Sequence, residues 1–200
     1  MSCILICPVC VPEPLHTNLA GPGPHIILCP NVFPKCAYLA GLARDAGRAT
    51  IYVDADMLYS GYMHAGMMER LPHVLVRRPD PPGWNAELTT MIRMTSAEPH
   101  LVIVDTLNGL GGMWGGPVGI RRAVHSIMLL AALGRDVGTT VVVAAAARAG
   151  QAGYELAPGG RLVGGAGRLY LLKGGEPVPL ADAGSADRPG GAGDRRPMGA

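Results

Sequence analysis

The sequence contains six short, mainly apolar runs that would give a strand no polar face. This feature constrains the fold of the chain most. In these runs Val, Ile, Leu and Ala mostly follow one another, without the regular alternation of a half-exposed strand. They cover residues 25–29, 50–54, 73–77, 100–105, 139–147 and 169–172. Strands of this kind are typical of parallel sheets that are covered on both faces. We therefore predict an α/β fold with a mainly parallel central sheet flanked by helices.

Three segments between the runs have the spacing of amphipathic helices. The first, residues 35–46, is followed by Gly47, which we expect to end it. Asn85 is expected to cap a second helix, which closes before Pro99. Pro117 is expected in the first turn of a third, longer helix.

The length and composition fit a single domain followed by a tail. Two hundred residues are typical of one domain, and we assign residues 1–182 to this core. Residues 183–200 contain five Gly, two Pro and three Arg but no branched aliphatic or aromatic side chain. We expect that stretch to be a disordered tail.

Charge and cysteine content exclude some classes of function. Seventeen basic residues stand against 15 acidic ones, and a net charge of +2 gives no bulk attraction to nucleic acid. No apolar run approaches the roughly 18–20 residues that span a bilayer, so no membrane role is expected. Five Cys, an odd number, all lie before residue 37, which indicates reduced thiols and a cytoplasmic protein.

The pair Cys7 and Cys10 has the spacing of half a zinc site. The remaining candidate ligands before residue 37 do not form a second close pair with the usual spacing. Free or buried thiols are therefore the alternative interpretation of these cysteines.

Candidate functional residues follow three of the apolar runs, where open parallel sheets bind their ligands. Residues 29–36 have the spacing of the phosphate-binding loop G-x-x-x-x-G-K-[ST], with Lys35 at the Lys position. Asp56 follows the second run, and Asp105 ends the fourth. Carboxylates placed in this way can act as a general base or bind Mg²⁺. The alternatives are a solvated lysine at a helix start and an aspartate that caps a turn.

Taken in order, these segments resemble the RecA/RadA recombinase family of P-loop ATPases. The segments that carry the resemblance are IYVDAD at 51–56, LVIVDTL at 101–107, TVVVAAAAR at 140–148, PGG at 158–160 and GRLYLLKG at 167–174. The resemblance covers about residues 20–180. It implies a RecA-like P-loop NTPase fold with a C-terminal hairpin, in a divergent paralogue of the archaeal RadA/RadB kind.

The resemblance also implies roles for particular residues. Nucleotide contacts fall on Pro30, Asn31, Lys35 and Cys36. The catalytic carboxylate falls on Asp56, and the Mg²⁺ ligand falls on Asp105.

Two glycine-rich segments are similar to the DNA-binding loops of the family. Arg148, Tyr154 and Arg161 flank the second loop and are candidates for contact with single-stranded DNA by charge and stacking. Residues 109–119, which include Trp114, correspond to the first loop. The alternatives are an ordinary surface loop for the second segment, and a partner anchor or lid for an exposed Trp114.

The phosphate-binding loop departs from the family pattern. Pro34 has no N–H to offer a phosphate, and Phe33 crowds the same turn. The Cys36 thiol is a soft ligand where Mg²⁺ prefers a hydroxyl oxygen. Ala146 falls near the Gln that senses the γ-phosphate in the family. The degenerate Walker A loop therefore predicts poor nucleotide binding.

These observations lead to three functional hypotheses. The first is a non-catalytic RecA/RadA-like paralogue, a pseudo-ATPase accessory in DNA recombination and repair. Its expected partners are a RadA-type recombinase or another repair protein and, weakly, single-stranded DNA; no cofactor is expected unless the degenerate site still binds ATP and Mg²⁺. The second is an active but unusual ATP-binding ATPase, at best a weak DNA-dependent one. The third is a KaiC-like regulatory interaction domain.

Overall fold

The computed structural model describes residue 19 and residues 24–150, 153–156 and 167–180. This part of the chain contains eight strands and five helices. The strands are β1 (Pro24–Cys29), β2 (Thr50–Asp54), β3 (Val74–Arg77), β4 (Leu101–Asp105), β5 (Thr140–Gly150), β6 (Gly153–Leu156), β7 (Arg168–Lys173) and β8 (Glu176–Pro179).

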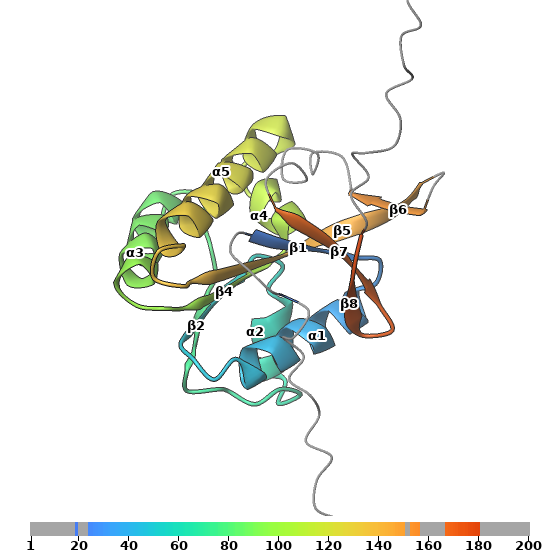
Figure 1. The fold of residues 1–200 in the computed structure, drawn as a ribbon, viewed down its shortest axis with the longest axis horizontal. Helices are drawn as coiled ribbons and strands as arrows, with labels where there is room; N and C mark the ends of the chain where they lie inside the picture. The colour runs from blue at the N-terminus through green and yellow to red at the C-terminus, as the bar shows by residue number, and fades with distance from the viewer. Residues whose placement is uncertain (1–18, 20–23, 151–152, 157–166, 181–200) are drawn as a thin grey trace, which may run out of the picture.

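The strands form one twisted sheet in the order β3-β2-β4-β5-β1-β7-β8 (Figure 1). All neighbours from β3 to β7 are parallel, and β8 runs antiparallel to β7. The predicted α/β architecture with a mainly parallel sheet is therefore confirmed. The strands that contain Leu28, Val53 and Ile103 lie inside the sheet, as their apolar character requires.

The central strands contribute to two separate cores, because successive side chains of a strand point to opposite faces. In β4, Val102 and Val104 belong to one core, while Leu101 and Ile103 belong to the other. All four side chains are buried. This division explains why the apolar runs show no alternation.

Helices cover the two faces of the sheet (Figure 1). The helices are α1 (Val32–Asp45), α2 (Leu58–His64), α3 (Trp84–Ala97), α4 (Leu107–Gly112) and α5 (Gly116–Gly134). The first two pack on one face, and the other three pack on the opposite face. The predicted helices correspond to α1, α3 and α5. The short α2 and α4 were not predicted, and α4 (LNGLGG) is half glycine, a poor helix former.

The predicted end of one helix is confirmed, whereas the predicted start of another is wrong. Gly47 follows α1 with a φ of 62°, the left-handed conformation expected of a glycine at a helix end. The prediction that Asn85 caps α3 is wrong, because the helix begins at Trp84 and its N-cap is Gly83. The Asn85 side chain instead accepts a hydrogen bond from Arg122 of α5 at 2.9 Å.

Two hairpins extend the sheet. Gly174 and Gly175, with φ of 63° and 93°, form the two-residue turn between β7 and β8. Positive φ at both positions is what a tight hairpin turn requires. This is the expected C-terminal hairpin. A second hairpin pairs β6 with the far end of β5, which continues beyond the predicted run to Gly150.

The segment that was compared with the first DNA loop is mostly helical. It includes the end of α4 and the start of α5. The interpretation of Trp114 as an exposed side chain is wrong: its ring is half-buried and packs edge-on against Trp84, with ring centroids 5.9 Å apart. The Arg122 guanidinium lies 4.8 Å from the centroid of the Trp114 ring.

None of the described helices combines the length and apolar character needed to cross a membrane. The expected tail at 183–200 and the pair Cys7 and Cys10 lie outside the described residues.

We predict that Gly119→Ala will destabilise the protein by about 1–3 kcal/mol, the usual cost of overpacking. A Cβ at this position would overlap the backbone carbonyl oxygen of Gly111, where α5 crosses α4. The matched control is Gly112→Ala, whose added Cβ meets no atom within 4 Å. Urea unfolding of the two variants provides the measurement, and equal stabilities would contradict the close contact between α4 and α5.

Candidate functional site

Three of the sequence-predicted site residues meet at the carboxyl edge of the sheet. The ammonium group of Lys35, in the first turns of α1, contacts Asp105 at the end of β4. The same Lys35 Nζ lies 3.0 Å from Asp56 Oδ2, just beyond β2. The expected clustering of these side chains is thus observed, because parallel strands end on the same side.

Asp105 is fully buried, and both of its carboxylate oxygens have partners. Lys35 donates a hydrogen bond to Oδ1, and the Tyr52 hydroxyl donates one to Oδ2 at 2.9 Å. Tyr52 is itself buried and stacks on Tyr59, with ring centroids 4.1 Å apart. The carboxylate therefore belongs to an enclosed network and is shielded from solvent.

Asp56 is more accessible and is held by the start of α4. The Thr106 hydroxyl lies 3.2 Å from both Asp56 oxygens, and it also accepts a hydrogen bond from the Gly109 N–H at 3.0 Å. Thr106 thus caps α4 and orients Asp56 at the same time. The Asp56 side chain keeps 27% of its surface exposed, so it is the member of the cluster that solvent reaches.

The pKa values of the cluster follow from its burial and charges. Burial alone lowers the pKa of Lys35, but hydrogen bonds and charges from Asp105 and Asp56 outweigh this effect and raise it overall. Burial raises the pKa of Asp105, and Lys35 offsets only part of the increase. Lys35 therefore stays protonated at neutral pH and serves as the internal counter-charge of the two aspartates.

The connection between β1 and α1, where the phosphate-binding loop was predicted, is short. Only Pro30 and Asn31 separate Cys29 from the first residue of α1. Asn31 is the N-cap residue and makes no side-chain cap hydrogen bond. Pro34 occupies the third position of the helix, so one of the N–H groups that a helix start normally presents to an anion is missing.

Cys36 and Cys29 are buried thiols. Cys36 lies in α1 with 3% of its surface exposed, and burial raises its pKa. Burial also raises the pKa of Cys29 to about 12. Both side chains are thus neutral at physiological pH and are unsuited to bind a hard cation.

The cluster does not fit the Mg²⁺ ion that the resemblance implies at Asp105. Lys35 and Tyr52 already engage both carboxylate oxygens of Asp105, and a cation would have to displace the ammonium group. Among the residues that the structure describes, no three His, Cys, Asp or Glu side chains come together as metal ligands.

The predicted DNA-binding residues fall on the β5–β6 hairpin. Arg148 and Tyr154 are exposed on its two paired strands, where Arg148 is opposite Glu155 and Tyr154 is opposite Ala149. Arg161 lies outside the described residues.

Three polar residues near the cluster were not identified from the sequence. Tyr52 occupies an apolar strand and Thr106 follows Asp105 without a motif of its own. Asn108 accepts a hydrogen bond from the backbone N–H of Ala146 at 2.7 Å and thereby joins α4 to β5. One sequence signal could have identified Thr106. A threonine at the N-cap accepts a hydrogen bond from the backbone N–H three residues later, which here is that of Gly109.

The fold and the cluster define an α/β protein with a mainly parallel sheet and a lysine–carboxylate network at its carboxyl edge. A scan against protein-family models found no match, and a search of curated proteins found none either.

We predict that Lys35→Ala will destabilise the protein by about 3–5 kcal/mol, because it leaves the buried carboxylate of Asp105 without a counter-charge. Asp105→Asn added to this variant should recover part of the loss, since the amide carries no charge. Urea unfolding of both single variants and the double variant forms a thermodynamic cycle. Strictly additive effects of the two substitutions would contradict the coupling between these side chains.

We also predict that the protein loses stability as the pH rises above 9. The Cys29 pKa is about 12 in the folded state against 9.0 as its ordinary value, so the folded state holds this proton more tightly. The stabilisation is complete below pH 9 and is lost as the pH rises towards 12. Urea unfolding measures the free energy of unfolding at pH 8 and pH 11. Between these two values it should fall by about 2 kcal/mol less in Cys29→Ala than in the wild-type protein. Equal losses in both proteins would contradict the prediction.

Proposed function

We propose that this protein is a non-catalytic RecA/RadA-like paralogue that acts as an accessory in DNA recombination and repair. The observation that carries the pseudo-ATPase part of this proposal is the pairing of Lys35 with Asp105 and Asp56. A lysine that binds phosphate must present its charge to the ligand. Here the ammonium group is buried and its charge is already balanced.

The energetic balance supports the same conclusion. Phosphate binding would require Lys35 to leave two charge-assisted hydrogen bonds, each worth about 1.5–3 kcal/mol. It would also leave Asp105 buried without its cation. The chain between β1 and α1 offers few backbone donors in return, because Pro34 has none.

The arrangement of the sheet supports the RecA-like part of the proposal. The segments that resemble the family become neighbouring strands, with β5 between β1 and β4. Lys35 and Asp56 follow the carboxyl ends of β1 and β2, and Asp105 is the last residue of β4. The expected partners are a RadA-type recombinase or another repair protein. Any contact with single-stranded DNA would be weak and would involve Arg148 and Tyr154 on the β5–β6 hairpin.

The convergence of the same three side chains favours an active ATPase as a second candidate. In such an enzyme Lys35 would contact the phosphates of ATP, and Asp56 would act as a general base. The exposed part of Asp56 is compatible with that role. The inward pairing of Lys35 argues against it.

We predict that the wild-type protein will neither hydrolyse ATP nor bind it measurably. Titration of a fluorescent ATP analogue with Mg²⁺ should show no saturation, and about 5 mM ATP should shift the melting temperature by no more than about 1 °C. Restoring Cys29→Gly, Phe33→Gly, Pro34→Gly and Cys36→Thr together should recover some affinity, because these changes supply backbone donors and a hydroxyl.

The matched control is Lys35→Arg, which keeps the positive charge but replaces the compact ammonium group. ATP hydrolysis by the wild-type protein that disappears in a folded Lys35→Arg variant would favour the active ATPase. A fourfold variant that folds but still does not bind nucleotide would contradict the role that we assign to the loop.

A further inference from the structure

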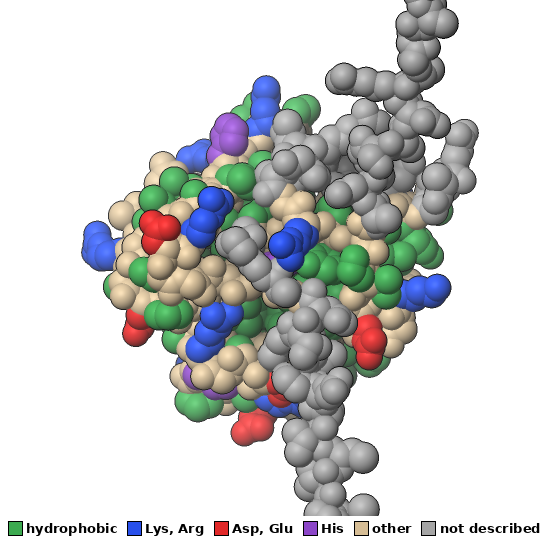
Figure 2. Space-filling model, viewed as in Figure 1, with side chains coloured by type: hydrophobic (Ala, Val, Ile, Leu, Met, Phe, Trp, Pro, Cys, Tyr) green, Lys and Arg blue, Asp and Glu red, His purple; other side chains and the backbone are tan. Residues whose placement is uncertain are grey.

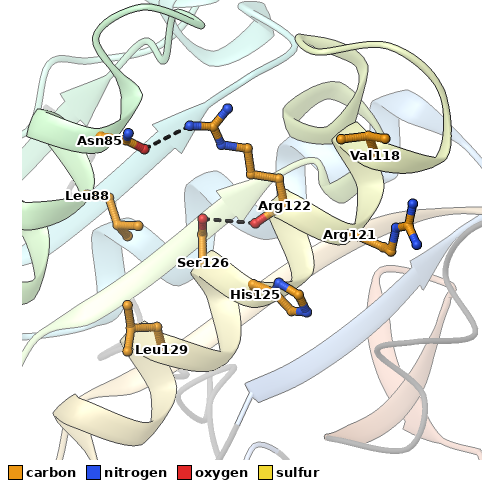
Figure 3. Close-up of a pocket in the computed structure, with 8 residues that line it drawn as sticks. All are labelled: Asn85, Leu88, Val118, Arg121, Arg122, His125, Ser126 and Leu129. Carbon is orange, nitrogen blue, oxygen red and sulfur yellow. Dashed lines mark hydrogen bonds between the residues drawn. The ribbon is translucent and has the colours of Figure 1, made fainter.

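A groove of about 610 Å³ lies between α3 and α5, outside the Lys35 cluster (Figure 3). Asn85 and Leu88 contribute to it from α3. The other lining residues come from one surface of α5 and are Val118, Arg121, Arg122, His125, Ser126 and Leu129.

Hydrogen bonds and ring contacts fix the two helices on either side of the groove. The Trp84 indole N–H donates a hydrogen bond to the Ser126 hydroxyl at 3.0 Å, which joins α3 to α5. Arg122 reaches across to Asn85 (Figure 3). Its guanidinium also lies over the Trp114 ring. The groove is therefore already formed and needs little ordering to bind a ligand.

The two sides of the groove differ in chemistry. Leu88 of α3 and Leu129 of α5 make one side of the groove apolar. Arg121 and His125 project from α5 on the opposite side (Figure 3). Val118 is 63% exposed, although its side chain is apolar. None of the described residues that line the groove is acidic. Figure 2 shows basic and histidine side chains gathered over the part of α5 at the top of the view.

The spacing of the groove residues points to a helical ligand. Val118, Arg122, His125 and Leu129 follow one another at intervals of four, three and four residues, so they share one face of α5. This is the spacing of a seam between two packed helices. The core-facing side of α5 uses other residues. Within the seam, Arg122 contacts Asn85 and Trp114, while Val118 and Leu129 remain exposed apolar side chains.

We propose that the α3–α5 groove binds an acidic amphipathic helix of a partner protein. The apolar side chains of that helix would pack against Leu88, Val118 and Leu129. Its Glu or Asp side chains would pair with Arg121 and accept a hydrogen bond from the His125 ring. This arrangement matches both the apolar and the cationic side of the groove. The inference does not depend on nucleotide chemistry at Lys35.

The same features disfavour other occupants. A second copy of the chain would bring an identical face, since symmetric dimers pair a patch with itself. Such a dimer would double the positive charge and add no acidic partner. Nucleic acid would pair with the arginines, but its phosphates would bury the exposed Val118 and Leu129 without an apolar contact.

The test uses a fluorescein-labelled synthetic peptide of three heptads, with Leu at the a and d positions and Glu at e and g. Fluorescence anisotropy should show binding to the full chain with a Kd of about 10–100 µM. Arg121→Glu and Leu129→Ser should each weaken it about tenfold or more, because one removes the charge pairing and the other the apolar contact. The same peptide with Lys in place of Glu should not bind.

Arg93→Glu is the matched control, because it makes the same charge change on an exposed part of α3 that does not line the groove. Its affinity should stay within about twofold of wild type, and thermal unfolding should show that all variants are folded. Equal binding of the Glu and Lys peptides, no binding of the Glu peptide, or no effect of Arg121→Glu and Leu129→Ser would overturn the proposal. So would oligonucleotide binding that Arg121→Glu abolishes, or a dimer in sedimentation that Leu129→Ser dissociates.

Discussion

Burial of the central strands on both faces is the constraint from which the candidate site follows. Side chains such as Ile26 and Ile103 have no exposed surface, so polar groups are largely confined to the ends of the strands. Because the strands are parallel, their carboxyl ends meet, and Lys35 comes within reach of Asp105 and Asp56. The same constraint places Asp105 where no water can stabilise its charge.

A cation for Asp105 must then come from the protein itself, and Lys35 supplies it. This requirement changes how the lysine of the phosphate-binding pattern is interpreted. From the sequence it was either a phosphate ligand or a solvated residue at the start of a helix. In the structure its side chain is buried and pairs with both aspartates, so it is not a solvated residue, and a phosphate would have to compete with Asp105 and Asp56 for the ammonium group. A lysine at this spacing is therefore also compatible with a purely structural role as a buried counter-charge.

The strands were predictable because a strand buried on both faces consists mainly of apolar residues. The clustering of Lys35, Asp56 and Asp105 was predictable because parallel strands end at the same edge of the sheet. The hydroxyl of Tyr52 was not predictable, because an apolar run shows that a residue is buried but not which atom it contacts. Helix α4 is stabilised by the Thr106 cap and by packing against α5. These two interactions outweigh the low helix propensity of its glycines. Trp114 was misinterpreted for a similar reason, since its partner Trp84 is distant in sequence.

Helix α4 connects the two features on which the proposals rest. At one end Gly109 lies so close to Asp56 that a Cβ would overlap the carboxylate. At the other end Gly111 meets Gly119 of α5, the helix that carries most of the groove. Arg121 and Leu129 line the groove from α5, and neither is among the nearest atoms that a Cβ at Gly109, Gly111 or Gly119 would meet. Substitutions at Arg121 or Leu129 can therefore alter the groove without moving Asp56, whereas an added methyl group at Gly109 would displace the Asp56 carboxylate and one at Gly119 would push against the backbone of α4.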